Sequence, residues 1–128
     1  MLVRRTLIPL LALALLGAAA LAVSAGAKVP TKTYATKLVM SEKFPAFHGQ
    51  LESKNKFCIG ARPVKLYRER SGPDKLLGTD RSDGSGAWKV SLGNKLTSGA
   101  YYSLAPVFGS ASLGITCKLA KSQVAVVD

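Results

Sequence analysis

Residues 57–68 read FCIGARPVKLYR and join a cysteine, a Gly/Pro turn and an alternating run of apolar and basic residues. The second of the two cysteines, Cys117, lies far along the chain. The end of the stretch has the two-residue period of a half-buried β-strand, with Val64, Leu66 and the stem of Arg68 facing inward. We therefore expect a core strand here, and a disulfide would close the domain around the turn that precedes this strand.

The beginning of the chain has the pattern of a secretory signal peptide. Arg4 and Arg5 precede an apolar run, and the small residues Ala25 and Ala27 suit a signal-peptidase site. The apolar run is short for a membrane-spanning helix of about 20 residues, and an uncleaved anchor is the alternative. We therefore predict a signal-peptide helix at residues 1–27 and a secreted, extracellular protein that contacts the membrane only before cleavage.

Export would place both cysteines in an oxidising compartment. Two cysteines allow a single pairing, so we predict a disulfide between Cys58 and Cys117 rather than two free thiols. In the chain-entropy account, closing a loop of this length stabilises the fold by about 4 kcal/mol. A mature chain of roughly 100 residues builds only a small core, so it would benefit from such a crosslink.

Basic residues outnumber acidic residues in this chain. The sequence has 18 Lys and Arg against 7 Asp and Glu, and its net charge of +11 falls to +9 when Arg4 and Arg5 leave with the signal peptide. Such a charge attracts anionic surfaces, such as teichoic or uronic polymers and lipid headgroups. Export makes nucleic acid an unexpected partner. Because the basic residues are scattered, a solvated surface without a specific partner is the alternative.

The mature chain consists of short alternating runs separated by turn signals, without a sustained helical period. Turn-forming residues gather at 71–74 and 80–86, a flexible loop is expected at 109–114, and Pro106 should lie at a strand end. Runs of this kind predict an all-β fold, an antiparallel β-sandwich of about seven strands at residues 44–128. Residues 28–43 would be a basic linker or a first strand. Inward positions are expected at Phe47, Gly49, Leu51, Trp88, Val90 and Leu92.

A series of spaced residues in the second part of the chain has the order seen in a known family. The series is Phe47, Gly49, Leu51, Ser53, Cys58, Gly60, Arg62, Val64, Leu66, Tyr67, Asp83, Gly86, Trp88, Gly99, Tyr101, Tyr102, Cys117, Ala120 and Ser122. In this order it resembles small secreted bacterial domains of the carboxypeptidase-regulatory-like, prealbumin-like kind. The resemblance implies a seven-stranded sandwich and a non-catalytic, extracellular accessory or surface role.

Related surface modules of the Cna-B type can carry a Lys–Asn isopeptide crosslink that needs an asparagine on the last strand. The only asparagines of this sequence are Asn55 and Asn94, and neither belongs to the expected last strand. We therefore expect no such crosslink.

Candidates for catalysis or metal binding are few, and we predict that the protein is not an enzyme. His48, the only histidine, falls on the outward face of its strand, and no nucleophile elbow lies near it. One histidine and two paired cysteines cannot supply a zinc site. Asp80 and Asp83 suit a turn better than a calcium loop, because no Glu closes the loop. We expect no metal and no cofactor.

Tyrosines beside basic residues are the candidates for ligand contact. We expect Lys65, Tyr67, Arg68 and Tyr101 to face a ligand, because tyrosine rings stack on sugars and cations attract acidic groups. Tyr101 and Tyr102 are neighbours on one expected strand, so one should enter the core and the other should be exposed.

The resulting hypothesis is a secreted, non-catalytic β-sandwich module with an extracellular or cell-envelope accessory or binding role. Its partner would be an anionic polysaccharide, an envelope polymer or another surface protein. The alternative is a basic protein that binds anionic envelope polymers by charge alone, and a small hydrolase is less favoured.

Overall fold

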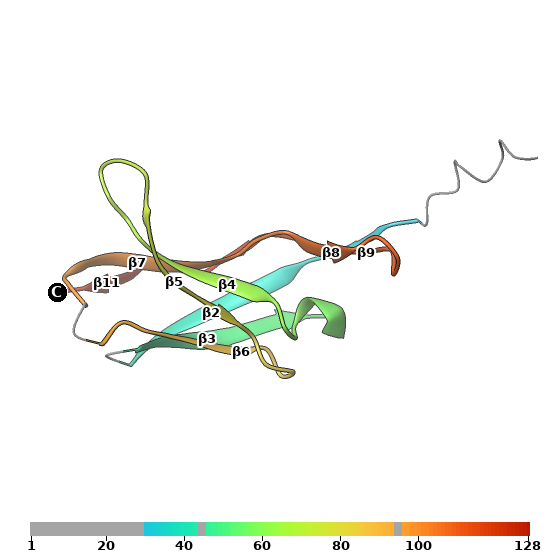
Figure 1. Ribbon diagram of the computed structural model, residues 1–128, viewed down its shortest axis with the longest axis horizontal. Helices are drawn as coiled ribbons and strands as arrows, with labels where there is room; N and C mark the ends of the chain where they lie inside the picture. Colours follow the sequence, from blue (N-terminus) through green and yellow to red (C-terminus); the bar gives the residue numbers. More distant parts are fainter. Residues whose placement is uncertain (1–29, 44–45, 94–95) are drawn as a thin grey trace, which may run out of the picture.

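The computed structural model describes residues 30–43, 46–93 and 96–128, in which the fold is all-β and sandwich-like (Figure 1). These residues form eleven strands and one 3-10 turn. The predicted all-β class is confirmed. The expected number of about seven strands was too low, because five of the strands are only two or three residues long and carry little periodic signal. The predicted signal-peptide helix at residues 1–27 lies outside the described residues.

One layer of the sandwich is a three-stranded antiparallel sheet in the order β2-β3-β6. Its strands are β2 (Thr36–Lys43), β3 (Ala46–Ser53) and β6 (Ala87–Ser91). Gly49 of β3 lies opposite both Met40 and Trp88. A Cβ atom at Gly49 would lie 1.8 Å from the carbonyl oxygen of Val39. Glycine is therefore needed for the close approach of these strands.

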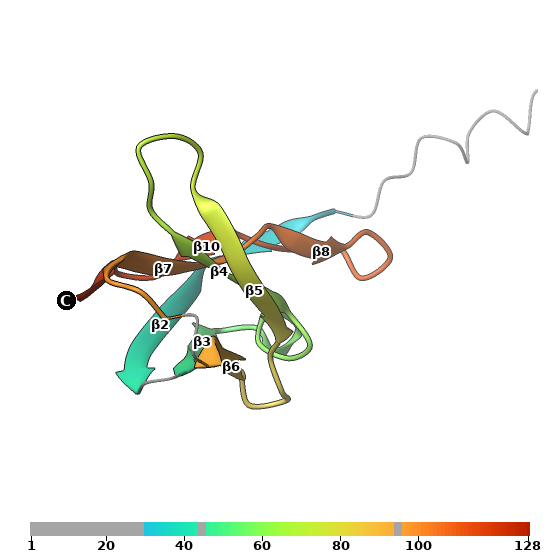
Figure 2. The same cartoon turned by 60° about the vertical axis from the view of Figure 1, so that its left-hand side comes forward.

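The facing layer is a larger sheet in the order β10-β7-β4-β5, with β11 also paired to β7 (Figures 1 and 2). The strands are β4 (Pro63–Arg68), β5 (Lys75–Arg81), β7 (Gly99–Ala105), β10 (Ala120–Lys121) and β11 (Ala125–Val127). β4 and β5 form a hairpin whose turn, residues 69–74, stands out from the layers. Pro106 follows the end of β7, as the sequence predicts.

A third, small sheet extends the sandwich at one end in the order β1-β9-β8 (Figure 1). Its strands are β1 (Lys32–Tyr34), β8 (Phe108–Ser110) and β9 (Ile115–Cys117). β1 runs parallel to β9, so the sheets are not all antiparallel as expected. The flexible loop expected at 109–114 is instead the β8–β9 hairpin turn, which the amide of Gly114 closes by donating to the carbonyl of Ala111 at 3.2 Å.

Residues 28–43 were expected to be a basic linker or a first strand. The described part of this segment, residues 30–43, contains β1 and β2. β2 pairs with β3 along its whole length, and Leu38 of β2 is buried between the layers. Lys32, Thr33 and Lys37 are exposed, and these polar residues obscured the apolar side of the segment in the sequence.

The core lies between the two larger sheets. Phe47 and Leu51 of β3 meet Val64 and Leu66 of β4, and Trp88 is buried as expected. This contact of apolar faces is the main source of stability in a two-layer fold. Within the described residues, we find no helix that is long and apolar enough to cross a membrane.

Candidate functional site

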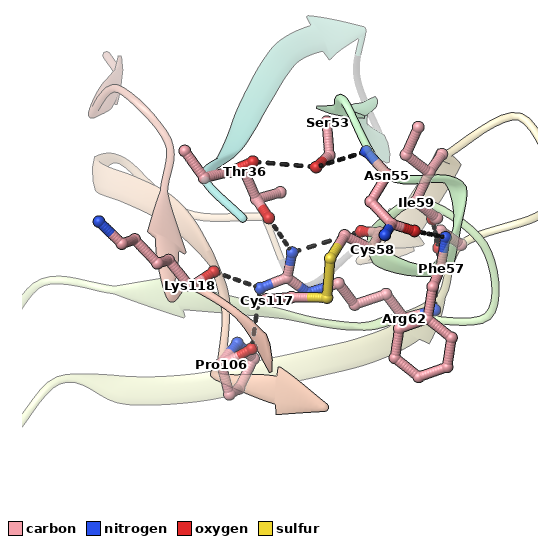
Figure 3. The surroundings of a disulfide bond; sticks show 12 residues. Thr36, Ser53, Asn55, Phe57, Cys58, Ile59, Arg62, Pro106, Cys117 and Lys118 are labelled. Carbon is pink, nitrogen blue, oxygen red and sulfur yellow. Dashed lines mark hydrogen bonds between the residues drawn. A yellow bond between two sulfur atoms is a disulfide. The ribbon is translucent and has the colours of Figure 1, made fainter. Parts of the chain in front are cut away.

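Cys58 and Cys117 form the predicted disulfide (Figure 3). Their Cα atoms are 5.5 Å apart, and both residues are fully buried. Cys58 ends the 3-10 turn η3 (Lys56–Cys58), and Cys117 ends β9. The crosslink therefore attaches the small sheet to the turn that precedes β4.

The guanidinium of Arg62 lies beside this disulfide and joins four segments of the chain (Figure 3). Its Nη1 donates to Thr36 Oγ1 and to the carbonyl of Cys58 at 3.3 Å. Its Nη2 donates to the carbonyls of Pro106, at 3.0 Å, and Lys118. Arg62 is fully buried, and this desolvation lowers its pKa. Because the contacts are all internal, Arg62 has a structural role.

Sequence reasoning counted Arg62 among the scattered surface cations, and this was wrong. The signal that identifies it is its phase: Arg62, Val64 and Leu66 are spaced by two residues, so all three face inward. Alternation extended back from Val64 places Arg62 on the inner side, although arginine is rarely a buried residue. Three backbone carbonyls that need donors explain the exception.

The outer face of the larger sheet gathers part of the expected ligand-facing set. Directly opposite residues in a sheet share a face. Lys65 lies opposite Leu104, which in turn lies opposite Lys121. Tyr67 lies opposite Tyr102 in the next row. We call Lys65, Tyr67, Tyr102 and Lys121 the tyrosine–lysine face.

The tyrosines of this face are held by their neighbours. The rings of Tyr67 and Tyr102 stack with centroids 5.4 Å apart and an interplanar angle of 15°. The Nζ atom of Lys121 lies 4.2 Å from the centroid of the Tyr102 ring, a cation–π contact. The hydroxyl of Tyr102 donates to Asp74 Oδ2 at 2.5 Å. The face is therefore arranged before any ligand arrives.

The hydrogen bond between Tyr102 and Asp74 raises the pKa of the tyrosine and lowers the pKa of the carboxyl group. It is the main reason why the pKa of Tyr102 is raised to about 12. The same bond, followed by the amide of Arg70, lowers the pKa of Asp74. At neutral pH the pair is therefore a neutral phenol donating to a charged carboxylate, and it ties the β4–β5 turn to β7.

Two of the four expected ligand-facing residues do not lie on this face. Tyr101 is only 1% exposed, because its ring packs on Phe47 in the core and its hydroxyl bonds to Thr97. Arg68 points to the inner side, and its Nη2 donates to the carbonyl of Ser98 at 2.8 Å. Tyr101 and Tyr102 do point to opposite faces, as predicted, but the outward tyrosine is covered by Tyr67 and Lys121.

The acidic loop of the sequence is a turn, as predicted. Asp83 Oδ1 accepts hydrogen bonds from the amides of Ser85, at 2.9 Å, and Ala87, at 3.0 Å, and from the Ser85 hydroxyl. These bonds lower the pKa of Asp83, the hydroxyl contributing most. Among all the described residues, including this turn, no group of three or more His, Cys, Asp or Glu residues could hold a metal ion.

A comparison with known protein families found no family that matches this chain, and a search of curated proteins found no match either. The class of this protein is therefore assigned from its fold and its disulfide. They define a small, mostly-β, sandwich-like domain with one internal crosslink.

Proposed function

We propose that the chain is a secreted, non-catalytic β-sandwich module of the carboxypeptidase-regulatory-like, prealbumin-like kind that binds an anionic polysaccharide of the extracellular space or cell envelope. The tyrosine–lysine face would be its binding surface. The observation that carries the proposal is a fixed cluster of three side chains. Lys121 Nζ lies 4.2 Å from the centroid of the Tyr102 ring, and this ring is stacked on Tyr67.

The chemistry of this face suits an acidic sugar polymer. Tyr67 is partly exposed and offers an apolar ring, whereas Lys65 and Lys121 flank the tyrosines along the neighbouring row. A tyrosine that is already stacked loses little side-chain freedom on binding, which favours affinity. The net charge of +9 that remains when Arg4 and Arg5 leave with the signal peptide adds long-range attraction to a polyanion.

The disulfide supports the extracellular part of the proposal. Disulfides persist in oxidising compartments and are rare where thiols are kept reduced. The Cys58–Cys117 crosslink is therefore compatible with an extracellular location. The signal-peptide pattern of residues 1–27 points in the same direction.

Binding of the oxidised protein to polygalacturonate tests the proposal. We expect saturable binding to this uronic polymer and little binding to dextran, a neutral polysaccharide. Tyr67→Ala should weaken binding about tenfold, which corresponds to about 1.4 kcal/mol, because it removes the partly exposed aromatic ring on which a sugar would pack. Lys65→Gln and Lys121→Gln should each weaken it as well.

The matched control is Lys37→Gln, which removes one exposed positive charge from β2 on the other sheet. If charge alone drives binding, the three Lys→Gln variants should weaken binding equally, Tyr67→Ala should not, and the affinity should fall steeply with salt. That result would replace the proposed face with the charge-only alternative.

A further inference from the structure

A pocket of about 280 Å³ lies at the end of the sandwich where β4 and β5 leave the core. Its apolar wall comes from both layers: Leu77 of β5, Tyr101 of β7 and Leu92, which follows β6. Its polar wall holds Arg68 and Lys75. The pocket is thus separate from the tyrosine–lysine face, which covers the opposite side of the same sheet.

The two cations of the pocket lie directly opposite each other on β4 and β5. Like charges in this position repel each other. Arg68 donates to the carbonyl of Ser98, but its Nε atom is buried and has no hydrogen-bond partner among the described residues. No carboxylate of the described part of the chain pairs with Arg68 or Lys75. The site therefore holds positive charge that no carboxylate of the described residues neutralises.

Gly99 supports the position of the Arg68 guanidinium. A Cβ atom at Gly99 would lie 2.9 Å from Arg68 Nε, and the backbone there has a φ of +149°. Glycine is thus needed at this position both for its conformation and for the space that it leaves. The space at Gly99 admits the guanidinium, and its hydrogen bond to the carbonyl of Ser98 fixes its position at the pocket.

We propose that this pocket binds a small amphipathic carboxylate, with its ring or short chain against Leu77 and Leu92 and its carboxylate at Arg68 and Lys75. Guanidinium groups favour carboxylates because their fixed donors match the two oxygens. A cavity of about 150 Å³ is enough to hold benzene in another protein. The present pocket therefore has room for a ring that bears a carboxylate arm.

Titration of the oxidised protein with phenylacetate, followed by amide chemical shifts, tests this site. A ligand of so few atoms should bind with a Kd on the order of 1 mM. We expect shifts at Leu92, Thr97 and Tyr101, and binding at least tenfold weaker for phenylacetamide, the neutral analogue, and for acetate, which lacks the ring. Equal binding of phenylacetamide and phenylacetate would overturn the assignment.

Lys75→Gln is the main variant because Lys75 is exposed, so the fold should be retained. It should weaken phenylacetate binding about tenfold, as expected for one charge-assisted hydrogen bond. Arg68→Gln should weaken it at least as much. Lys121→Gln, which removes the same charge from the opposite face, should leave it unchanged. Equal affinities of the Lys75→Gln and Lys121→Gln variants would overturn the proposal.

Different substitutions test the two proposed sites, so either proposal can be wrong without the other. Tyr67→Ala should leave phenylacetate binding unchanged while it weakens polygalacturonate binding. Lys75→Gln should do the reverse.

Discussion

Arg62 is a cation that occupies the position of a core residue. Burying a charge is costly unless hydrogen bonds replace its hydration. Here the carbonyls of Cys58, Pro106 and Lys118 accept these hydrogen bonds, and each carbonyl belongs to a different connection between strands. The two Nη atoms supply donors to these carbonyls, whereas the buried Nε has no hydrogen-bond partner among the described residues. Removal of the side chain therefore leaves several buried acceptors without donors.

We predict that Arg62→Met lowers the free energy of unfolding by about 3 kcal/mol, because the freed carbonyls lose their donors. Urea denaturation of the oxidised protein measures the change. Arg81→Met is the control: Arg81 is exposed and donates to one carbonyl, that of Ala61 at 3.1 Å, so the loss should stay below about 1 kcal/mol. Equal losses would show that the buried network contributes nothing.

Tyr102 and Asp74 make the stability depend on pH at both extremes. The pKa of Tyr102 is raised to about 12 in the folded protein, whereas an unfolded tyrosine titrates near about 10. Its contribution is therefore complete below the unfolded value and is lost as the pH rises through the folded value. The lowered pKa of Asp74 acts at the other end, and its contribution is lost as the pH falls into the acid range.

We predict that Asp74→Asn lowers the pKa of Tyr102 toward its ordinary value, because the charged acceptor is removed. An ultraviolet absorbance titration of tyrosinate follows this change, and Tyr102→Phe identifies the signal. Asp83→Asn removes a carboxylate from another turn and should leave the titration as it is. An unchanged high tyrosine pKa in Asp74→Asn would contradict the assigned hydrogen bond.

At the scale of elements, β3 is the strand on which the smaller sheet depends. It pairs with β2 on one side and with β6 on the other. Gly49 is the point of closest approach, since an added Cβ would also lie 2.8 Å from the indole atom Cζ2 of Trp88. A side chain at this position must push apart either the strands or the core.

We predict that Gly49→Ala destabilises the protein by about 3 kcal/mol, within the range of overpacked sites. Thermal or urea denaturation measures the loss. Gly72→Ala is the matched control, because no atom lies within 4 Å of an added Cβ in the β4–β5 turn. A stability of Gly49→Ala equal to that of Gly72→Ala would contradict the strand spacing.

For the whole molecule, the disulfide limits how far Cys58 and Cys117 can separate when the chain unfolds. It joins residues 59 positions apart and holds the small sheet to the turn before β4. The loop between them contains β4, β5, β6 and β7, which is most of the sandwich. The crosslink therefore reduces the freedom of the unfolded chain throughout the domain.

We predict that the Cys58→Ala and Cys117→Ala double variant loses about 4 kcal/mol of stability relative to the oxidised protein, as the chain-entropy account requires. Urea denaturation of the two proteins measures the difference, and the double variant avoids free thiols. Reduction of the unaltered protein should produce a similar loss. Stability that survives both treatments would show that packing alone holds the small sheet.

The sequence by itself was enough for the all-β class, the disulfide and the inward positions of β3, β4 and β6. Strand alternation is a local pattern, and two cysteines allow only one pairing, so neither prediction required the tertiary structure. The same alternation placed Tyr101 and Tyr102 on opposite faces. The expectation that Tyr101 faces a ligand was not met, since Tyr101 is the inward tyrosine, and two adjacent aromatic residues give no local signal that separates them.

Only the tertiary structure decided which residues share a surface. Tyr67 meets Tyr102 and Lys121 through the pairing of β4, β7 and β10, which brings together residues far apart in the chain. Arg62 is buried where it donates to the carbonyls of Pro106 and Lys118, which are distant in the sequence, and no local pattern records these contacts. Local periodicity determines on which side of a strand a residue lies, whereas its neighbours across the sheet depend on the register that folding selects.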